Sequence, residues 1–524
     1  MNQALSHRTY SIALLAWLIS VLFSGIGFVQ AGLENGEFCY ALDDSFIMMA
    51  ISRNLAFHGV WGLTAHEFSS CASSPLFTVL LASSNKVLGA PIWLPLVINV
   101  LGLGGLYTWV SFRCRDWGLN NWQTWMMLMG LFFLMPVPVL LFGSMEHILH
   151  TWIAFWALHR MLDGKAELHP GLAMLMGALL AGIRYEGLFE GGLLVLWLWK
   201  QKRWLSGFAF GIGMAIPVFS LGLYSIAQGW FFLPNSLVLK GITMNVQDTG
   251  NVLGFLLSWL SKAANHPHAM VAILVLYFLW NWKPAQTGNH RDWIALVLGM
   301  SLAHFALARY NHVYRYEAYL MAAAWLVFWK TICQSGLVAN TASLWKEFRE
   351  QPFTGLLYGL LLLSPLWRSI DSYATGTRAM VNIYQQQVQT GKFIRQHYNQ
   401  AVVGAIDIGA IAWYSDCKLI DLWGLADMDI ARLKLADQYK TDPVHAVCEK
   451  KKMEIAVVYG NLMPHPAWKK VESWVIPNNA VCSRDTIYFI AFKPESRSQL
   501  KSALSGFRSH LPTAVKVLKE PRVD

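Results

Sequence analysis

Two adjacent carboxylates, Asp43 and Asp44, stand directly before a segment with helical spacing and are the strongest candidates for chemistry in this sequence. A like-charged neighbour raises the pKa of one carboxylate toward that of a useful general base. The simpler interpretation is a helix N-cap, a position that Asp favours. A cap needs only one Asp, so this interpretation leaves the second carboxylate unexplained.

Three further segments place cations in apolar surroundings: Arg184 before Tyr185 and Glu186, Lys240 after Leu-Pro-Asn-Ser, and Arg315 before Tyr316. Guanidinium and ammonium groups bind phosphate through charge-assisted hydrogen bonds. The alternatives without chemistry are a buried Arg–Glu pair, a snorkelling lysine and a basic aromatic belt. Beside a carboxylate pair, these cations suit a reaction on a phosphate-bearing substrate.

The composition indicates that a membrane positions these groups. Of the 524 residues, 55% are hydrophobic and 14% are charged, whereas about 25% are charged in ordinary soluble domains. So little charge cannot cover the surface of a soluble protein with this much apolar side chain. Soluble enzymes, disordered chains and fibrous proteins are therefore excluded.

The hydropathy predicts an α-helical polytopic membrane protein. With about 20 apolar residues to a span, residues 1–370 hold about eleven transmembrane helices. Pro75–Leu88 is expected to be a shorter helix that dips into the membrane. Residues 32–75 are expected to form the first periplasmic loop. There Ile47, Ile51 and Leu55 recur every four residues, which predicts an amphipathic helix lying on the membrane surface.

Residues 371–524 have the composition of a soluble domain, because they hold about half of the charged residues of the chain. β-rich runs alternate with helical ones there, which predicts a small extracytoplasmic α/β domain. Strands are expected at 401–406, 418–422, 455–459 and 487–492, and helices at 385–398 and 443–452.

Basic residues in short loops predict the orientation, because such residues favour the cytoplasmic side. They gather on the side of the N-terminus, for example at Arg8, Arg113, Arg160 and Lys200. The N-terminus is therefore expected in the cytoplasm. With an odd number of spans, the C-terminal domain and all four candidate segments lie on the external face. If the phosphate-bearing substrate is an activated sugar donor, a lipid-linked phosphate sugar is expected on that face. Nucleotide sugars are not normally available outside the cytoplasm.

Cysteine and histidine spacing bears on redox and metal chemistry. Cys39 and Cys71 flank the amphipathic helix on the oxidising side and are a candidate disulfide; two unpaired buried thiols are the alternative. No Cys-x-x-Cys pair occurs, and His147 and His150 are three residues apart rather than four, so no metal site is predicted. No compact basic stretch with interleaved aromatics suggests nucleic acid.

The ordered set of motifs resembles the bacterial GT-C glycosyltransferases, integral-membrane enzymes that use polyprenyl-phosphate sugars, in their arabinofuranosyltransferase-like and mannosyltransferase-like branch. Residues 42–47, Arg53-Asn54 and Ser74-Pro75 resemble the first periplasmic loop of that family. The resemblance continues in order at 143–146, 184–187, 233–240, Arg315-Tyr316, 405–409 and 420–425, and so covers most of the chain. Tyr185 stands where the family usually has Pro.

The resemblance implies a bacterial inner-membrane enzyme that moves a sugar from a polyprenyl-phosphate donor to an envelope glycan, lipid or protein acceptor. An acidic residue of the first loop is then the general base, either Asp43 or Asp44, with Asp43 slightly favoured. No particular cofactor is predicted, and a divalent cation is compatible with the reaction. The donor-binding residues would be Arg184, Lys240, Arg315 and Tyr316, with Tyr40, Arg53, Ser74, Glu146, Glu186 and Asn235 in supporting positions.

Two other functions fit parts of this pattern. A transporter or flippase of lipid-linked sugars would also have many spans and buried charges, but its binding site would lie near the bilayer midplane, often between repeats. No repeat is evident here, and the candidate residues gather at one face. A polysaccharide polymerase or ligase would differ in its acceptor more than in its chemistry.

Overall fold

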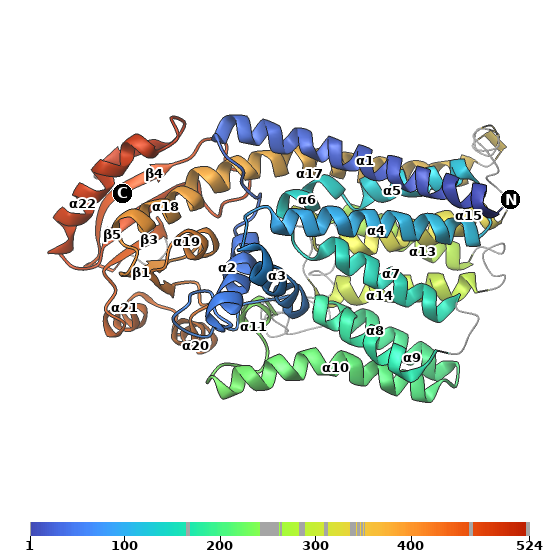
Figure 1. Ribbon diagram of the computed structural model, residues 1–524, viewed down its shortest axis with the longest axis horizontal. Coiled ribbons are helices and arrows are strands. Elements are labelled where there is room, and N and C mark those ends of the chain that lie inside the picture. Colours follow the sequence, from blue (N-terminus) through green and yellow to red (C-terminus); the bar gives the residue numbers. More distant parts are fainter. Residues whose placement is uncertain are drawn as a thin grey trace.

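The protein consists of a helical body and a C-terminal domain built on a mixed sheet (Figure 1). The computed structural model describes the chain except residues 1, 164–167, 242–260, 262–264, 282–288, 309–312, 336–341, 343–345, 347–348, 351, 461–464 and 520–524. The N-terminus lies at the end of the helical body that is farthest from the C-terminal domain (Figure 1).

Three helices in the described part of the chain are long and apolar enough to cross a membrane. They are His7–Asn35, which is most of α1 (Asn2–Asn35), α4 (Leu94–Asp116) and α10 (Trp204–Ala227). A fourth is formed if α5 (Asn121–Leu134) and α6 (Val137–Gly143), bent by 50° at their junction, make one span. Pro136, which lies between α5 and α6, explains the bend, because proline interrupts the helical hydrogen-bond ladder.

The remaining helices of the body are shorter or fall partly outside the described residues. The expected short helix at 75–88 is confirmed as α3. The other bounds are α7 (His147–Leu162), α8 (Pro170–Ile183), α9 (Gly187–Lys200), α11 (Asn235–Gly241), α13 (Pro267–Asn281), α14 (His290–Leu307), α15 (Ala318–Gln334) and α17 (Pro352–Ile383).

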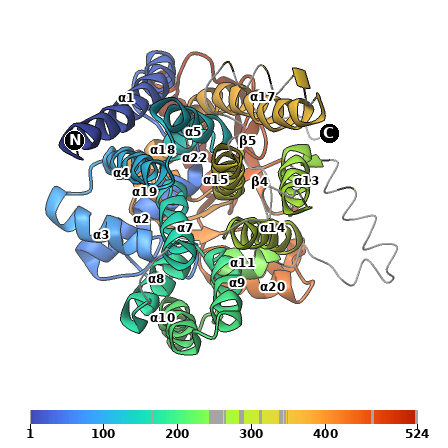
Figure 2. The same cartoon turned by 90° about the vertical axis from the view of Figure 1, so that its right-hand side faces the viewer.

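Helix α15 lies in the middle of the bundle (Figure 2). All its side chains from Ala318 to Ile332 are buried, as expected of a helix that is apolar on every side. The turn before its first residue therefore places Arg315 and Tyr316 near the bundle axis, at the end that faces the C-terminal domain.

The opposite end of the bundle is fastened by Asp163, the residue that follows α7. Its carboxylate accepts hydrogen bonds from Lys330 Nζ of α15 at 3.0 Å, from Trp117 Nε1 after α4 at 2.7 Å and from Trp293 Nε1 of α14 at 2.9 Å. The buried Lys330 is thereby neutralised. One carboxylate joins the ends of four helices.

Helix α2 (Asp43–His58) is not the surface helix that its spacing predicts. Ser45 to Ser52 are all buried, since α2 packs between α3 on one side and the C-terminal domain on the other. The four-residue repeat of Ile47, Ile51 and Leu55 marks one apolar face, but the intervening residues are covered as well.

The C-terminal domain contains a six-stranded sheet of order β2-β1-β3-β5-β4-β6. β1 (Val402–Ala405) is parallel to β2 (Lys418–Asp421) and β3 (Ile455–Tyr459), and the other pairs are antiparallel. The four predicted strands are confirmed, and β4 (Lys469–Val475) and β6 (Lys516–Lys519) are additional; the predicted strand at 487–492 is β5 (Thr486–Ala491). Its helices are α18 (Gln389–His397), α19 (Gly409–Tyr414), α20 (Met428–Leu435), α21 (Thr441–Lys450) and α22 (Ser496–Phe507).

The expected boundary between residues 370 and 371 falls inside α17. This helix continues through a π-helical turn, Tyr384–Val388, into α18 of the C-terminal domain. A continuous helical segment therefore joins the two parts of the chain.

Candidate functional site

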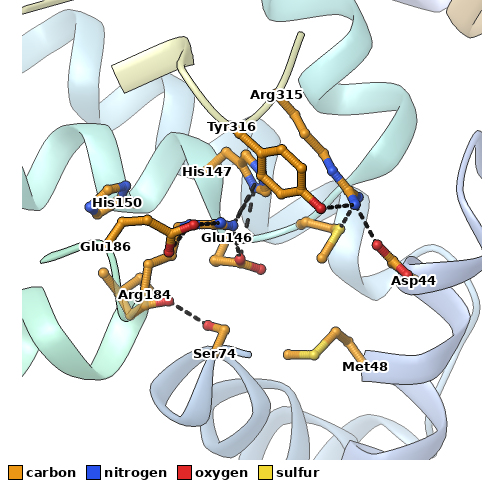
Figure 3. Close-up of polar contacts among 12 residues, drawn as sticks. Asp44, Met48, Ser74, Glu146, His147, His150, Arg184, Glu186, Arg315 and Tyr316 are labelled. Atoms are coloured by element: carbon orange, nitrogen blue, oxygen red, sulfur yellow. Dashed lines mark hydrogen bonds and ion pairs between the residues drawn. The ribbon is translucent and has the colours of Figure 1, made fainter. Parts of the chain in front are cut away.

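Charged side chains from four separate segments meet at the end of the bundle that faces the C-terminal domain (Figure 3). Asp44 comes from the first turn of α2, and Arg315 and Tyr316 from the turn before α15. Glu146 precedes α7, and Arg184 and Glu186 lie in the break between α8 and α9. The structure thus brings together six of the twelve predicted catalytic, donor-binding and supporting residues.

Asp44 forms an ion pair with Arg315. The Arg315 side chain is 4% exposed and the Asp44 side chain is 29% exposed, so the carboxylate is the accessible partner. Arg315 also donates from Nη2 to the Tyr316 hydroxyl at 3.1 Å and lies over the Tyr316 ring, 4.9 Å from its centroid. The ion pair therefore places an accessible carboxylate beside a buried cation.

Arg184 is neutralised by two carboxylates. It donates to Glu186 from Nε at 3.2 Å and from Nη2 at 2.6 Å, and it pairs with the fully buried Glu146. Its guanidinium carbon lies 5.7 Å from the centroid of the Tyr316 ring. Tyr316 therefore lies between two arginines. Among the described residues, Arg184 has two anionic partners and Arg315 has one.

Asp43 points away from this cluster and toward the C-terminal domain. Its carboxylate accepts hydrogen bonds from the backbone N–H groups of Gly409 at 2.7 Å and Ala410 at 2.8 Å, at the start of α19. It therefore caps a helix that lies far away in sequence rather than its own, whose N-cap is Leu42. The interpretation of the pair as a cap of α2 is wrong, and Asp44 rather than Asp43 faces the arginines of the cluster.

Asp407 lies close behind Asp43 in the C-terminal domain. Desolvation at this junction, with Asp407 as the next cause, raises the pKa of Asp43. Desolvation also raises the pKa of Asp407, whose carboxylate accepts a hydrogen bond from Gln387 Nε2 at 2.7 Å and another from the Tyr459 hydroxyl. The hydrogen bonds that Asp43 and Asp407 accept offset part of the cost of burying two carboxylates next to each other.

Three supporting residues hold backbone rather than reactive groups. The Tyr40 hydroxyl donates to Ile92 O at 2.7 Å and thereby fixes the loop before α2 against the start of α4. Ser74 donates to Ile183 O at 2.6 Å, directly before Arg184. Asn235 donates from Nδ2 to Gly424 O of the C-terminal domain at 2.9 Å.

Two further predicted residues lie elsewhere or outside the described atoms. Arg53 is on α2 three turns beyond Asp43 and donates to Trp413 O at 2.7 Å and Ala412 O at 3.1 Å, at the end of α19. Lys240 belongs to the short helix α11, but its side chain lies outside the described residues.

The predicted disulfide between Cys39 and Cys71 is wrong, since both are free and buried thiols. Each thiol has a different neighbour: Cys39 Sγ donates to Tyr40 O at 3.3 Å, and Cys71 Sγ lies 3.5 Å from Ser69 Oγ. Burial raises the pKa of the Cys71 thiol to about 12, so it is protonated at neutral pH. Two cysteines that flank a helix in one loop therefore do not pair in this structure.

Among the residues that the structure describes, no group of three or more His, Cys, Asp or Glu side chains has the arrangement of a metal site. His147 lies 3.2 Å from Arg184 Nη1, and His150 lies 2.9 Å from Glu190 Oε1.

Sequence reasoning missed a buried ion cluster next to the site. Glu317, directly after Tyr316, lies 3.0 Å from His268 Nε2 and 3.2 Å from Arg368 Nη2. All three residues are at most 5% exposed. Their signal in the sequence is a charge or histidine within or beside an apolar run, which is usually retained for a reason.

The comparisons with known proteins concern the C-terminal domain. A family model described as a domain of unknown function, DUF8728, matches residues 381–491. No curated protein matches the chain. The matched segment includes α19 and Asp407, and therefore the part of the domain that contacts Asp43.

Proposed function

We propose that this protein is an integral-membrane glycosyltransferase that moves a sugar from a polyprenyl-phosphate donor to an envelope glycan, lipid or protein acceptor on the periplasmic face. The observation that carries the proposal is the accessible Asp44 carboxylate held against the buried Arg315 guanidinium at one end of the bundle. A base and a phosphate-binding cation are the two groups that such a transfer needs.

The reaction assigns one role to each group. Asp44 accepts the proton of the acceptor hydroxyl while that oxygen attacks the anomeric carbon of the sugar. The bond from that carbon to the phosphate oxygen breaks, and the lipid phosphate leaves with the electron pair. Arg315 stabilises the charge that develops on the phosphate. When donor phosphate binds Arg315, it takes over part of the contact with Asp44 and leaves that carboxylate available to the acceptor.

The opposite ends of the helices support a membrane placement. α7 begins beside Glu146 at the site and ends beside Arg160 and Asp163 at the other end of the bundle. Its 16 residues span about 24 Å, compared with about 30 Å for the hydrocarbon core. α9 likewise runs from Glu186 to Lys200. We propose that the shorter helices complete a body of about eleven spans, with the basic end in the cytoplasm.

The orientation leads to a direct prediction. Alkaline phosphatase fused after the C-terminus is expected to be active in intact cells, because the enzyme matures only outside the cytoplasm. The same enzyme fused after Lys200, at the basic end of α9, is expected to be inactive. An inactive C-terminal fusion that accumulates as full-length protein would put the C-terminal domain in the cytoplasm and contradict the proposed donor.

The function itself is tested with a panel of labelled polyprenyl-phosphate sugars. Purified protein is expected to release sugar from one of them in the presence of an envelope acceptor. Arg315→Gln is expected to weaken donor binding roughly tenfold or more, because it removes a charge-assisted contact to phosphate. Arg113→Gln, at the basic end, is the matched control and should bind donor normally. Equal donor affinity in the folded Arg315→Gln protein would contradict the assigned role.

A transporter or flippase of lipid-linked sugars is the second candidate, favoured by the interrupted helices. α5 and α6 are bent by 50° at Pro136, and α8 and α9 are separated at Arg184, and transporters often bind substrate at such breaks. Proteoliposomes distinguish the two functions. Movement of labelled donor between leaflets without any glycosylated product would favour the transporter.

A further inference from the structure

We infer that the C-terminal domain positions the base, and that Asp43 and Arg53 are the positioning residues through which it does so. This inference rests on the proposed function, in which Asp44 accepts the proton. The evidence is the contact between α2, which carries Asp43, Asp44 and Arg53, and α19 of the C-terminal domain.

The two helices run side by side in the same direction, and α2 holds α19 at both ends. Asp43 accepts hydrogen bonds from the N–H groups of Gly409 and Ala410 at its start, and Arg53 donates to the carbonyl groups of Ala412 and Trp413 at its end. A negative charge at the N-terminus of a helix and a positive charge at its C-terminus both match its dipole. The Arg53 guanidinium also lies over the Trp413 ring, 5.1 Å from its centroid.

The contact is close because residue 409 is glycine. A Cβ atom at this position would lie 2.1 Å from Asp43 O and 2.9 Å from Ile47 N, both backbone atoms of α2. No side chain fits there unless the two helices separate. The position of α2 is therefore coupled to that of the sheet, because β1 ends only a few residues before α19.

The helical body holds α2 from the other side. Ser45, the residue after Asp44, donates from Oγ to Gly143 O at 2.5 Å. Asp44 thus lies between one contact with the C-terminal domain, through Asp43, and one with the helical body, through Ser45. Adjacent residues on a helix point in different directions. Because the Asp43 carboxylate faces the C-terminal domain, it fixes the rotation of α2 about its axis, and this rotation directs Asp44 to Arg315.

Three variants test this inference together. Asp43→Asn removes the charge that contacts the start of α19, and Arg53→Met removes the hydrogen bonds to its end. Gly409→Ala keeps every polar group but forces the two helices apart. Hydrogen exchange of the backbone amides in 405–414 is expected to become about 2- to 30-fold faster in each, the range for loss of a helix cap. At saturating donor, kcat is expected to fall in all three while the donor Kd and the melting temperature of the helical body stay unchanged.

Arg432→Met is the matched control. Arg432 also joins the C-terminal domain to the helical body, through Gly229 O at 3.2 Å, and among the described residues it forms no hydrogen bond or ion pair with α2. We expect normal kcat and normal exchange in 405–414 for this variant. Asp43→Glu should restore part of the activity lost in Asp43→Asn, because a longer carboxylate can still reach the N–H groups.

The outcomes separate this inference from the proposed function. If kcat collapses in Asp43→Asn alone and stays normal in Arg53→Met and Gly409→Ala, Asp43 is the base and the inference is wrong. Faster exchange with normal kcat would leave the contact purely structural, and unchanged exchange would mean that the two helices are not held as described. Absence of transfer with every donor would instead remove the proposed function, while the exchange data would still report the contact.

Discussion

Asp44→Asn is expected to lower turnover by about 10²–10⁴, the usual contribution of a general base. Asn occupies nearly the same volume and can still accept a hydrogen bond from Arg315, but it cannot take a proton from the acceptor hydroxyl. Donor affinity should therefore remain nearly normal, whereas transfer of labelled sugar at saturating donor should almost stop. Single-turnover kinetics with the preferred polyprenyl-phosphate sugar measures this difference.

Glu37→Gln provides the matched control, because Glu37 lies in the same loop but pairs with Lys392 rather than with the site. Its turnover should be normal. The melting temperature of each variant must be compared, because Asp44→Asn also leaves the buried Arg315 without a full charge partner. Near-normal turnover of a folded Asp44→Asn protein would remove the base from the proposed mechanism and favour the transporter.

Arg184→Met is expected to destabilise the helical body by about 3–5 kcal/mol, because it leaves the buried Glu146 without its cation. Arg184 already has two carboxylate partners, so we expect it to hold α7 against the break between α8 and α9 rather than to bind donor phosphate. Chemical unfolding in detergent should show the loss of stability, and donor affinity of the remaining folded protein should be close to normal.

The double variant Arg184→Met with Glu146→Gln tests the cause of that loss. Replacing the stranded carboxylate by a neutral amide removes the uncompensated buried charge, so much of the stability should return. The single change Glu186→Gln should cost less, because the Glu186 side chain is 19% exposed while that of Glu146 is fully buried. A tenfold loss of donor affinity in folded Arg184→Met would instead return Arg184 to the donor site.

A predicted strand and a missed strand differ in whether their residues form a continuous hydrophobic run. β3 is Ile-Ala-Val-Val-Tyr and is buried throughout, so its hydrophobic run is visible without structural context. β4 contains Glu472 and Ser473, both buried. Glu472 is tolerated in a strand interior because Arg508 pairs with it and Trp474 Nε1 donates to it at 3.0 Å. Only the folded chain shows that partner, which comes 36 residues later.

The sequence does not show which of Asp43 and Asp44 faces Arg315, because the deciding contact again joins residues that are far apart in the chain. Local rules describe a helix cap as a contact over a few residues, whereas Asp43 caps residues that follow it by 366 and 367 positions. The motif identifies the pair, and the tertiary contact decides which member faces Arg315. The position of Arg184 in an apolar run likewise indicates a buried charge, but its two carboxylate partners emerge only when α7 and the turn before α9 come together.

The central helix has a consequence for how far the bundle can move. α15 is fixed at one end by the Lys330–Asp163 pair, and at the other by Glu317, the residue before its first turn, which pairs with Arg368 and His268. Sliding this helix along its axis, or tilting it, would separate buried opposite charges at both ends, and each broken pair costs about 3–5 kcal/mol. A rocking motion that moves this helix and exposes the site alternately to the two sides of a membrane would have to break the ion pairs at both of its ends in every cycle. A donor that enters from the bilayer and reacts at one fixed face requires no such movement.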